Sequence, residues 1–244
     1  ILKKNIDGAI LTGRIGGYEE GGGRSGRISF ADSFHSADNR WNTLLGIQAE
    51  KTDPVWADQR DLTSRFNTNA YNGAAPLASR DWLVYSPFTS YKFLDPANCA
   101  NVKGGFDGSV DLQTRPGFGD ENYCGSMTTP GYRTLKNSKD GVQLYTHATW
   151  DFNDLAQGYA DVLLSHEKVK YHIGSNYTWW GTSVKWGYFY DPELDDFLNL
   201  QRAFTPEDMG GWENSMQENK STSYAVTVGV NGTGSATATL PGTR

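Results

Sequence analysis

The sequence lacks three features that would place it quickly. It has no run of 18 consecutive apolar residues, which excludes a transmembrane helix. Its net charge of −6 argues against nucleic acid as a partner, since phosphate binding needs a basic face. Its hydrophobic content of 37% is low for a large packed core. The chain begins ILKKN without Met or a signal peptide, which predicts a processed form or a fragment.

The sequence is rich in aromatic residues and glycine instead. Aromatic residues make up 13% of the 244 residues, with 8 Trp and 13 Tyr, and there are 28 glycines. Few aliphatic residues, many aromatic residues and many glycines are typical of β-barrels, which have polar lumens and long loops. The absence of an apolar helix does not exclude a membrane location, because barrel strands carry a much weaker hydropathy signal.

Residues 142–164 have the clearest pattern in the chain. Apolar and polar side chains alternate along 142–153, then a turn at 153–158 leads to a return strand that starts at Tyr159. A transmembrane β-hairpin needs this pattern, and a soluble antiparallel sheet has it too. The expected apolar side consists of Val142, Leu144, Thr146, Ala148, Trp150 and Phe152, followed on the return strand by Ala160, Val162 and Leu164.

Alternation of this kind predicts about six strands. Asp32 falls on an apolar side, which predicts either an interfacial position or a bulge that turns it away. Aromatic pairs flank two tight turns, Phe34 with Trp41 and Trp150 with Tyr159, as in the aromatic girdle of a membrane barrel. The strands are expected near residues 9–18, 24–35, 41–52, 141–153, 159–172 and 222–231.

The expected connections differ in length at the two ends of the strands. Two very long loops, 53–140 and 174–221, follow the third and fifth strands, whereas the connections after the second and fourth strands are short. Short turns at one end and long loops at the other are typical of outer-membrane barrels. Within the loops we expect a small strand or hairpin at 82–93 and a helix from Pro192 to Phe204, because Asp191-Pro192 resembles a helix start.

The two cysteines, Cys99 and Cys124, lie in one polar, glycine-rich region. We interpret them as a loop disulfide formed in an oxidising compartment; the alternative is a pair of free thiols. We predict no metal site. His166-Glu167 lacks the spacing of a zinc-protease motif, and the acidic run after Asp191 lacks the spacing and glycine of an EF-hand.

No catalytic constellation is evident, and we expect neither enzymatic activity nor a cofactor. Asp151 and Asp161 are expected to face each other near a turn, but lumen-facing carboxylates are ordinary in a water-filled barrel. Aromatic side chains in the second long loop are better candidates for ligand contact, since flat rings bind sugars or cyclic ligands at low entropic cost. The alternative is that they pack the loop against itself. These candidates are Trp179, Trp180, Trp186 and Tyr190.

Several stretches resemble the TonB-dependent outer-membrane receptors. Residues 1–8 (ILKKNIDG) look like the junction between the plug and the barrel, and residues 26–61 look like the second and third barrel strands. Residues 159–171 and 200–211 are similar to a barrel strand and an outer loop of that family. The family's TonB box, nearly all of its plug and the C-terminal half of its barrel have no counterpart in this sequence.

The resemblance implies an all-β, antiparallel, up-and-down transmembrane β-barrel segment in the outer membrane of a Gram-negative cell. It implies a plug-to-barrel junction at 1–8 and the N-terminal part of the barrel at 9–244, open as a fragment. The implied function is TonB-coupled uptake of a scarce nutrient such as a siderophore, vitamin, oligosaccharide or peptide. The implied partners are outer-membrane lipid, TonB through the missing plug, and the nutrient. The alternative is a secreted β-sandwich that binds carbohydrate.

Overall fold

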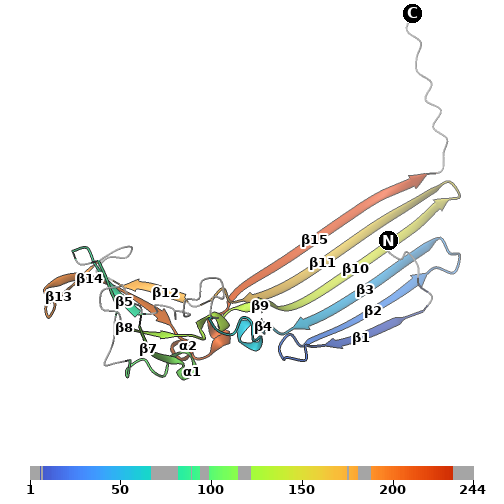
Figure 1. Ribbon diagram of the computed structural model, residues 1–244. Coiled ribbons are helices and arrows are strands. Elements are labelled where there is room, and N and C mark those ends of the chain that lie inside the picture. The colour runs from blue at the N-terminus through green and yellow to red at the C-terminus, as the bar shows by residue number, and fades with distance from the viewer. Residues whose placement is uncertain are drawn as a thin grey trace, which may run out of the picture.

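The computed structural model describes residues 6, 8–66, 82–88, 90–93, 99–114, 122–174, 176–180 and 188–232. The described chain is mostly β-strand, and all of its strand pairs are antiparallel. Figure 1 shows two parts: a sheet of long strands, and a smaller module built from the long connections at one end of that sheet. The expectation of an all-β antiparallel fold is confirmed.

The long sheet has six strands in the order β1-β2-β3-β10-β11-β15. Each strand therefore pairs with the next long strand along the chain. Among the described residues the sheet does not close on itself, and β1 and β15 form its two edges. The strands are β1 (Ile10–Gly16), β2 (Ser25–His35), β3 (Trp41–Thr52), β10 (Ser138–Asn153), β11 (Ala156–Tyr171) and β15 (Gln217–Gly232).

The pairing is continuous over most of the sheet, so residues that are direct cross-strand partners point their side chains to the same face. One side, here called the apolar face, carries most of the large hydrophobic side chains. The other side, here called the polar face, carries Gln, Ser, Thr, Asn and charged side chains. The apolar face includes Leu11, Phe30, Phe34, Ile47, Leu144, Trp150, Leu164, Tyr224, Val226, Val228 and Val230.

Two expectations about this sheet were wrong in detail, and one of the two alternatives for Asp32 is excluded. The turn after β10 is only residues 154–155, because the Asn153 side chain accepts the Leu155 N–H (2.9 Å) and starts the return strand early. The β2–β3 register is unbroken, so no bulge turns Asp32 from the apolar face. Tyr159 lies on the polar face, because it pairs directly with Gly229 in phase with the polar side chains. It therefore does not join Trp150 in an aromatic girdle.

The described parts of the long connections at 53–140 and 174–221 contain strands and short helices. Segments from both loops pair in one small sheet, where β14 (Asp196–Phe204) lies between β5 (Trp82–Ser86) and β12 (Asn176–Trp180), and β6 (Ser90–Phe93) pairs with β5. The expected hairpin at 82–93 is present as β5 and β6. The other elements are β4 (Val55–Trp56), β7 (Val110–Thr114), β8 (Asn122–Ser126), β9 (Thr134–Lys136), β13 (Phe189–Asp191), α1 (Gly105–Gly108), α2 (Pro206–Met209), η1 (Ala57–Gln59), η2 (Thr129–Gly131) and η3 (Trp212–Ser215).

The helix expected from Pro192 to Phe204 is wrong. Asp191 accepts hydrogen bonds from the N–H groups of Glu193 and Leu194 (2.9 and 3.2 Å), which closes a turn rather than capping a helix. Asp195 then adopts a left-handed conformation (φ 47°) that a continuing helix does not allow. Strands β13 and β14 pair on either side of this turn as a hairpin.

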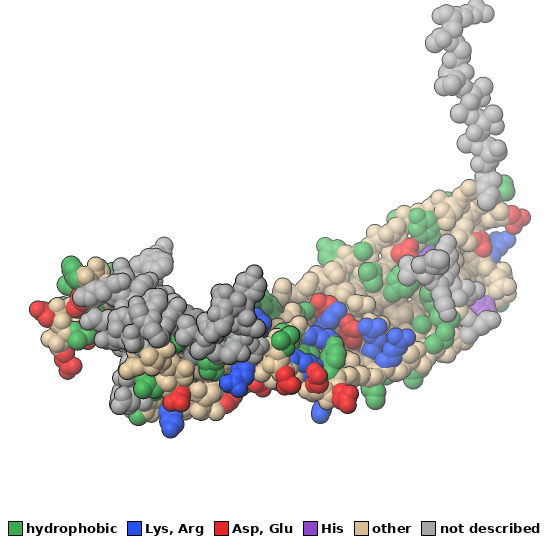
Figure 2. All heavy atoms as spheres, in the orientation of Figure 1, with side chains coloured by type: hydrophobic (Ala, Val, Ile, Leu, Met, Phe, Trp, Pro, Cys, Tyr) green, Lys and Arg blue, Asp and Glu red, His purple; other side chains and the backbone are tan. Residues whose placement is uncertain are grey.

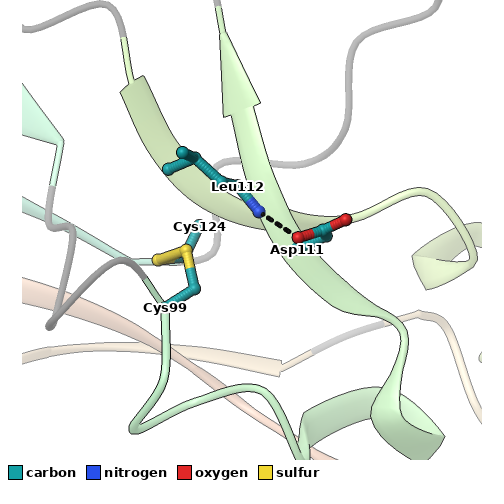
Figure 3. Close-up of a disulfide and its surroundings, with 4 residues drawn as sticks. All are labelled: Cys99, Asp111, Leu112 and Cys124. Atoms are coloured by element: carbon teal, nitrogen blue, oxygen red, sulfur yellow. Dashed lines mark hydrogen bonds between the residues drawn. A yellow bond between two sulfur atoms is a disulfide. The ribbon is translucent and has the colours of Figure 1, made fainter.

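The loop module has a compact hydrophobic core. Phe106 packs edge-on against Trp82 and Tyr132, with ring centroids 6.3 and 5.1 Å apart. Cys99 and Cys124 form a disulfide inside this core, beside Leu112 on the strand that pairs with Cys124 (Figure 3). The core residues are Trp82, Cys99, Phe106, Val110, Cys124, Tyr132 and Ala203.

Candidate functional site

The polar face of the sheet carries a cluster of three interacting side chains near its middle. Asp161 on β11 pairs directly with His147 on β10, so their side chains meet on the same face. One Asp161 oxygen accepts the Tyr145 hydroxyl (2.9 Å) and contacts His147 Nδ1 (2.7 Å). The carboxylate therefore orients the imidazole, since a proton on Nδ1 is donated to Asp161.

A cavity lies at this cluster, and its lining includes the interacting Tyr145, His147 and Asp161 side chains. It measures about 320 Å³. His147 is buried, with 7% of its surface exposed, and its Nε2 has no hydrogen-bond partner among the described residues. The lining residues are Tyr145, His147, Thr149, Gln157, Tyr159, Asp161 and Asn231.

This lining suits a ligand with several hydroxyl or amide groups. Tyrosine and threonine hydroxyls donate and accept, the Gln157 and Asn231 amides do both, and Asp161 accepts. Among the described residues that line this cavity, no serine or cysteine lies beside His147 as a nucleophile. The lining therefore offers several hydrogen-bond donors and acceptors, without the nucleophile of a catalytic triad among its residues.

Tyr159 is held in this cavity by a glycine. A Cβ at Gly229 would lie 2.5 Å from the Tyr159 ring, so the ring covers the bare backbone of β15. Cross-strand packing of an aromatic ring on glycine fixes both the strand register and the ring position. Asp151 does not face Asp161, contrary to expectation; it pairs with Gln157 and accepts that side chain's amide (2.7 Å).

Charges gather on the polar face at the end next to the loop module. Lys139 lies between Glu50 and Glu167, with N–O distances of 2.8 and 2.7 Å, and Arg27 also contacts Glu50 (2.8 Å). Two cations are thus matched by two carboxylates. Figure 2 shows a sheet surface that is mostly tan, with Lys, Arg, Asp and Glu side chains close together toward the loop module.

The four aromatic residues expected to contact ligand do not form one described site. Trp179 and Trp180 lie at the end of β12, paired with Gln201 and Leu200, and Trp186 lies outside the described residues. Tyr190 lies on β13 and is half exposed; its hydroxyl donates to Asp195 and its ring packs on Phe197 at 5.4 Å. Tyr190 therefore packs within its own hairpin and keeps half of its surface exposed.

An aromatic and carboxylate cluster in the loop module was missed by sequence reasoning. The Asp107 carboxylate accepts the Tyr132 hydroxyl (2.8 Å) and Trp212 Nε1–H (3.2 Å), and the Tyr132 and Trp212 rings lie 4.0 Å apart. Burial, with the neighbouring Asp107 carboxylate, raises the pKa of Tyr132, which keeps its hydroxyl protonated as a donor. The partners are 25 and 105 positions from Asp107 in sequence, so no local pattern reveals them.

Glu207 links the two long connections in the same region. Its carboxylate accepts the N–H groups of Phe106 (3.0 Å) and Asp107 (2.7 Å), both of which adopt left-handed backbone conformations. Consecutive N–H groups in such a turn form a concave anion site. Here the chain's own carboxylate occupies that site, so α2 is fixed to α1.

The two histidines near the end of β11, His166 and His172, lie in different surroundings. His166 contacts the Thr222 hydroxyl (2.8 Å), whereas His172 is buried against the Trp56 ring at 5.7 Å. Burial lowers the pKa of His172, which favours its neutral form. No group of three or more potential metal ligands is found in the part of the chain that the structure describes.

Comparisons with protein-family models, curated proteins and solved structures gave no match. Within the described residues, no helix combines the length and the apolar character needed to cross a membrane.

Proposed function

We propose that this chain forms part of the wall of an outer-membrane transporter, with the apolar face of its sheet against lipid. The observation that supports this most directly is exposure of that face. On β15 the side chains of Tyr224, Val226, Val228 and Val230 are 80, 64, 73 and 67% exposed, and nothing in the described part of the chain covers them. Isolated exposed apolar residues are normal, but a continuous exposed face marks an interaction surface.

The size of the apolar face fits a hydrocarbon layer. It extends along β10 from Val142 to Trp150, about nine residues, which is the length of a tilted membrane-spanning strand. Trp41 and Trp150 are cross-strand partners at its turn end, where an aromatic girdle would lie at the membrane interface. The charged Asp32 lies within this face and would be the least favourable side chain there.

The arrangement of connections supports the same proposal. Turns 36–40 and 154–155 lie at one end of the sheet, and the connections that carry the loop module lie at the other (Figure 1). Outer-membrane barrels sort their loops in this way, with short periplasmic turns and long extracellular loops. The disulfide in the loop module fits an oxidising compartment.

The transported substrate is, on this proposal, a scarce nutrient taken up with TonB-coupled energy. Support for the TonB connection comes from the sequence resemblance. In such a barrel wall, the polar cavity near His147 would face the lumen. The six described strands leave two edges unpaired, and unpaired edges are unfavourable in hydrocarbon. Transport therefore requires further strands beyond these six. The alternative, a secreted carbohydrate-binding sandwich, needs a second sheet over the apolar face, and the described residues contain none there.

Two arginine substitutions on neighbouring residues test the membrane location. Val228→Arg places a cation on the apolar face, which in hydrocarbon costs about 2–4 kcal/mol near the midplane. Thr227→Arg places the same cation on the polar face of the same strand. In the full-length protein folded into vesicles and unfolded with urea, only Val228→Arg should lower stability strongly. Equal effects, or recovery of the wild-type protein outside the membrane fraction, would refute the proposal.

A further inference from the structure

The apolar face ends, toward the loop module, in an excess of lysines. Lys168 on β11 is the direct cross-strand partner of Lys220 on β15, and like charges placed directly opposite destabilise a sheet. Glu218 contacts both, at 2.8 Å each, and Lys170 at 3.8 Å. One carboxylate therefore serves three ammonium groups. These four residues are called the lysine patch.

The opposite face at the same level along the strands carries a smaller excess of positive charge. There Lys139 and Arg27 are matched by Glu50 and Glu167, as described above, and Arg14, the cross-strand partner of Arg27, adds one further cation. Lys139 pairs with Val169, which lies between Lys168 and Lys170 on β11. The two charge clusters therefore lie at the same position along the strands but on opposite faces of the sheet. On the face that would meet lipid, Asp140 and Glu218 accompany four lysines, Lys51, Lys168, Lys170 and Lys220, so that face carries the larger excess of positive charge.

An apolar groove lies on the same face beside the lysine patch. It has a volume of about 610 Å³ and crosses β1, β2, β3 and β10. Gly13, Gly26 and Ala49 form its floor, and a Cβ at either glycine would meet nothing within 4 Å. Ile28 and Val142 line it with aliphatic side chains.

Lys51 connects the groove to the lysine patch. It lines the groove and lies in the same cross-strand row as Asp140, Lys168 and Lys220. Adjacent strands are about 4.8 Å apart, so the row from Lys51 to Lys220 spans about 14 Å. Three lysines and one carboxylate, Asp140, thus form a row beside the aliphatic surface.

We propose that this surface binds a phosphorylated lipid, with phosphate at the lysine patch and an acyl chain in the groove. A phosphate group accepts several charge-assisted hydrogen bonds and supplies the negative charge that three lysines around Glu218 lack. The groove is a gap in the apolar face that would otherwise pack poorly against lipid, and an acyl chain would fill it. The proposal rests on the membrane location proposed above.

The test measures binding of phosphatidic acid to the full-length protein in phosphatidylcholine nanodiscs. Each lysine near an anionic lipid surface contributes enough that removing two should weaken binding about 30-fold. We therefore expect Lys168→Gln/Lys220→Gln to raise the dissociation constant for phosphatidic acid by that factor. The control Lys136→Gln/Lys139→Gln removes two lysines from the same end of the molecule but not from the apolar face, and should bind as the wild type does.

The possible outcomes separate the two proposals. An inserted protein whose Lys168→Gln/Lys220→Gln variant retains phosphatidic acid as tightly as wild type overturns the lipid site alone. Equal weakening in the control variant overturns it too, because the effect would then follow total charge. Competition by millimolar inorganic phosphate as effective as phosphatidic acid itself would show a phosphate site without a lipid. A protein that fails to insert overturns both proposals.

Discussion

The sheet and the loop module bury their apolar residues in opposite ways. In the loop module, Phe106, Val110 and Cys124 are each at most 1% exposed and pack around a disulfide. In the sheet, Leu44 is the one large hydrophobic residue counted as buried among the described residues, and it lies on the polar face beside His147. The strands instead expose most of their large hydrophobic side chains on the apolar face.

This difference indicates two surroundings for one chain. The loop module carries its own core, as a water-exposed domain must. The sheet has one wet face and one apolar face without a partner, so its apolar side chains require some other apolar medium or partner. The following changes would sharpen or break this contrast, beginning with the largest expected effect.

Phe106→Ala should destabilise the loop module most. Removing a buried phenyl ring that contacts Trp82 and Tyr132 costs about 3–5 kcal/mol, through lost burial and the cavity left behind. Hydrogen exchange of the full-length protein should show lost protection at 122–132 and unchanged protection at 142–166. Phe88→Ala, at a side chain that is 78% exposed, is the control. Loss of protection in both regions would mean that they unfold as one unit.

Removing the disulfide should have the next largest effect. Cys99 and Cys124 are 25 positions apart, and a loop of that size loses about 3 kcal/mol of stabilisation when it is opened. The Cys99→Ala/Cys124→Ala variant should be cut by protease in the loop module at lower urea concentration, whereas sheet fragments persist. An unchanged cleavage profile would show that the hydrophobic core alone holds this module.

Lowering the pH should loosen the contact between α1 and α2. Burial acts to raise the pKa of Glu207, but hydrogen bonds from backbone N–H groups outweigh it and lower the pKa below its usual value. Its stabilising effect is therefore present above the ordinary glutamate pKa of about 4.5 and is lost as pH falls through the lowered folded value. Glu207→Gln should cost about 1 kcal/mol at pH 7, because the side chain is partly exposed, and should flatten this pH dependence.

Tyr145→Phe should have the smallest effect. It removes the hydroxyl donated to Asp161, while His147 remains in contact with the same carboxylate. Since the polar face is expected to be wet, water can replace the lost donor, and we expect a loss of about 0.5–1 kcal/mol in urea unfolding. A loss of several kcal/mol would contradict a solvated polar face and indicate that something dry covers the cluster.

Much of the sheet could be predicted from local pattern. The alternation at 142–152 determines which side chains share a face, because successive strand residues point to opposite sides. Bounds were less certain: β15 begins at Gln217 rather than near 222, since its polar first residues pair with the charged end of β11 and carry no apolar signal. The hairpin at 189–204 was mistaken for a helix because Asp191-Pro192 fits a helix start as well as a turn.

The sites depended on contacts that sequence does not encode locally. Tyr145 and Asp161 are 16 positions apart, and Glu207 lies about 100 positions from the backbone it holds. By itself, the sequence determined the two-faced strands and the sorting of long connections to one end, since both follow from side-chain alternation and chain length. Only the tertiary structure decided the polar cavity at His147 and the lysine patch, because the pairing register of the strands brings side chains from separate strands side by side.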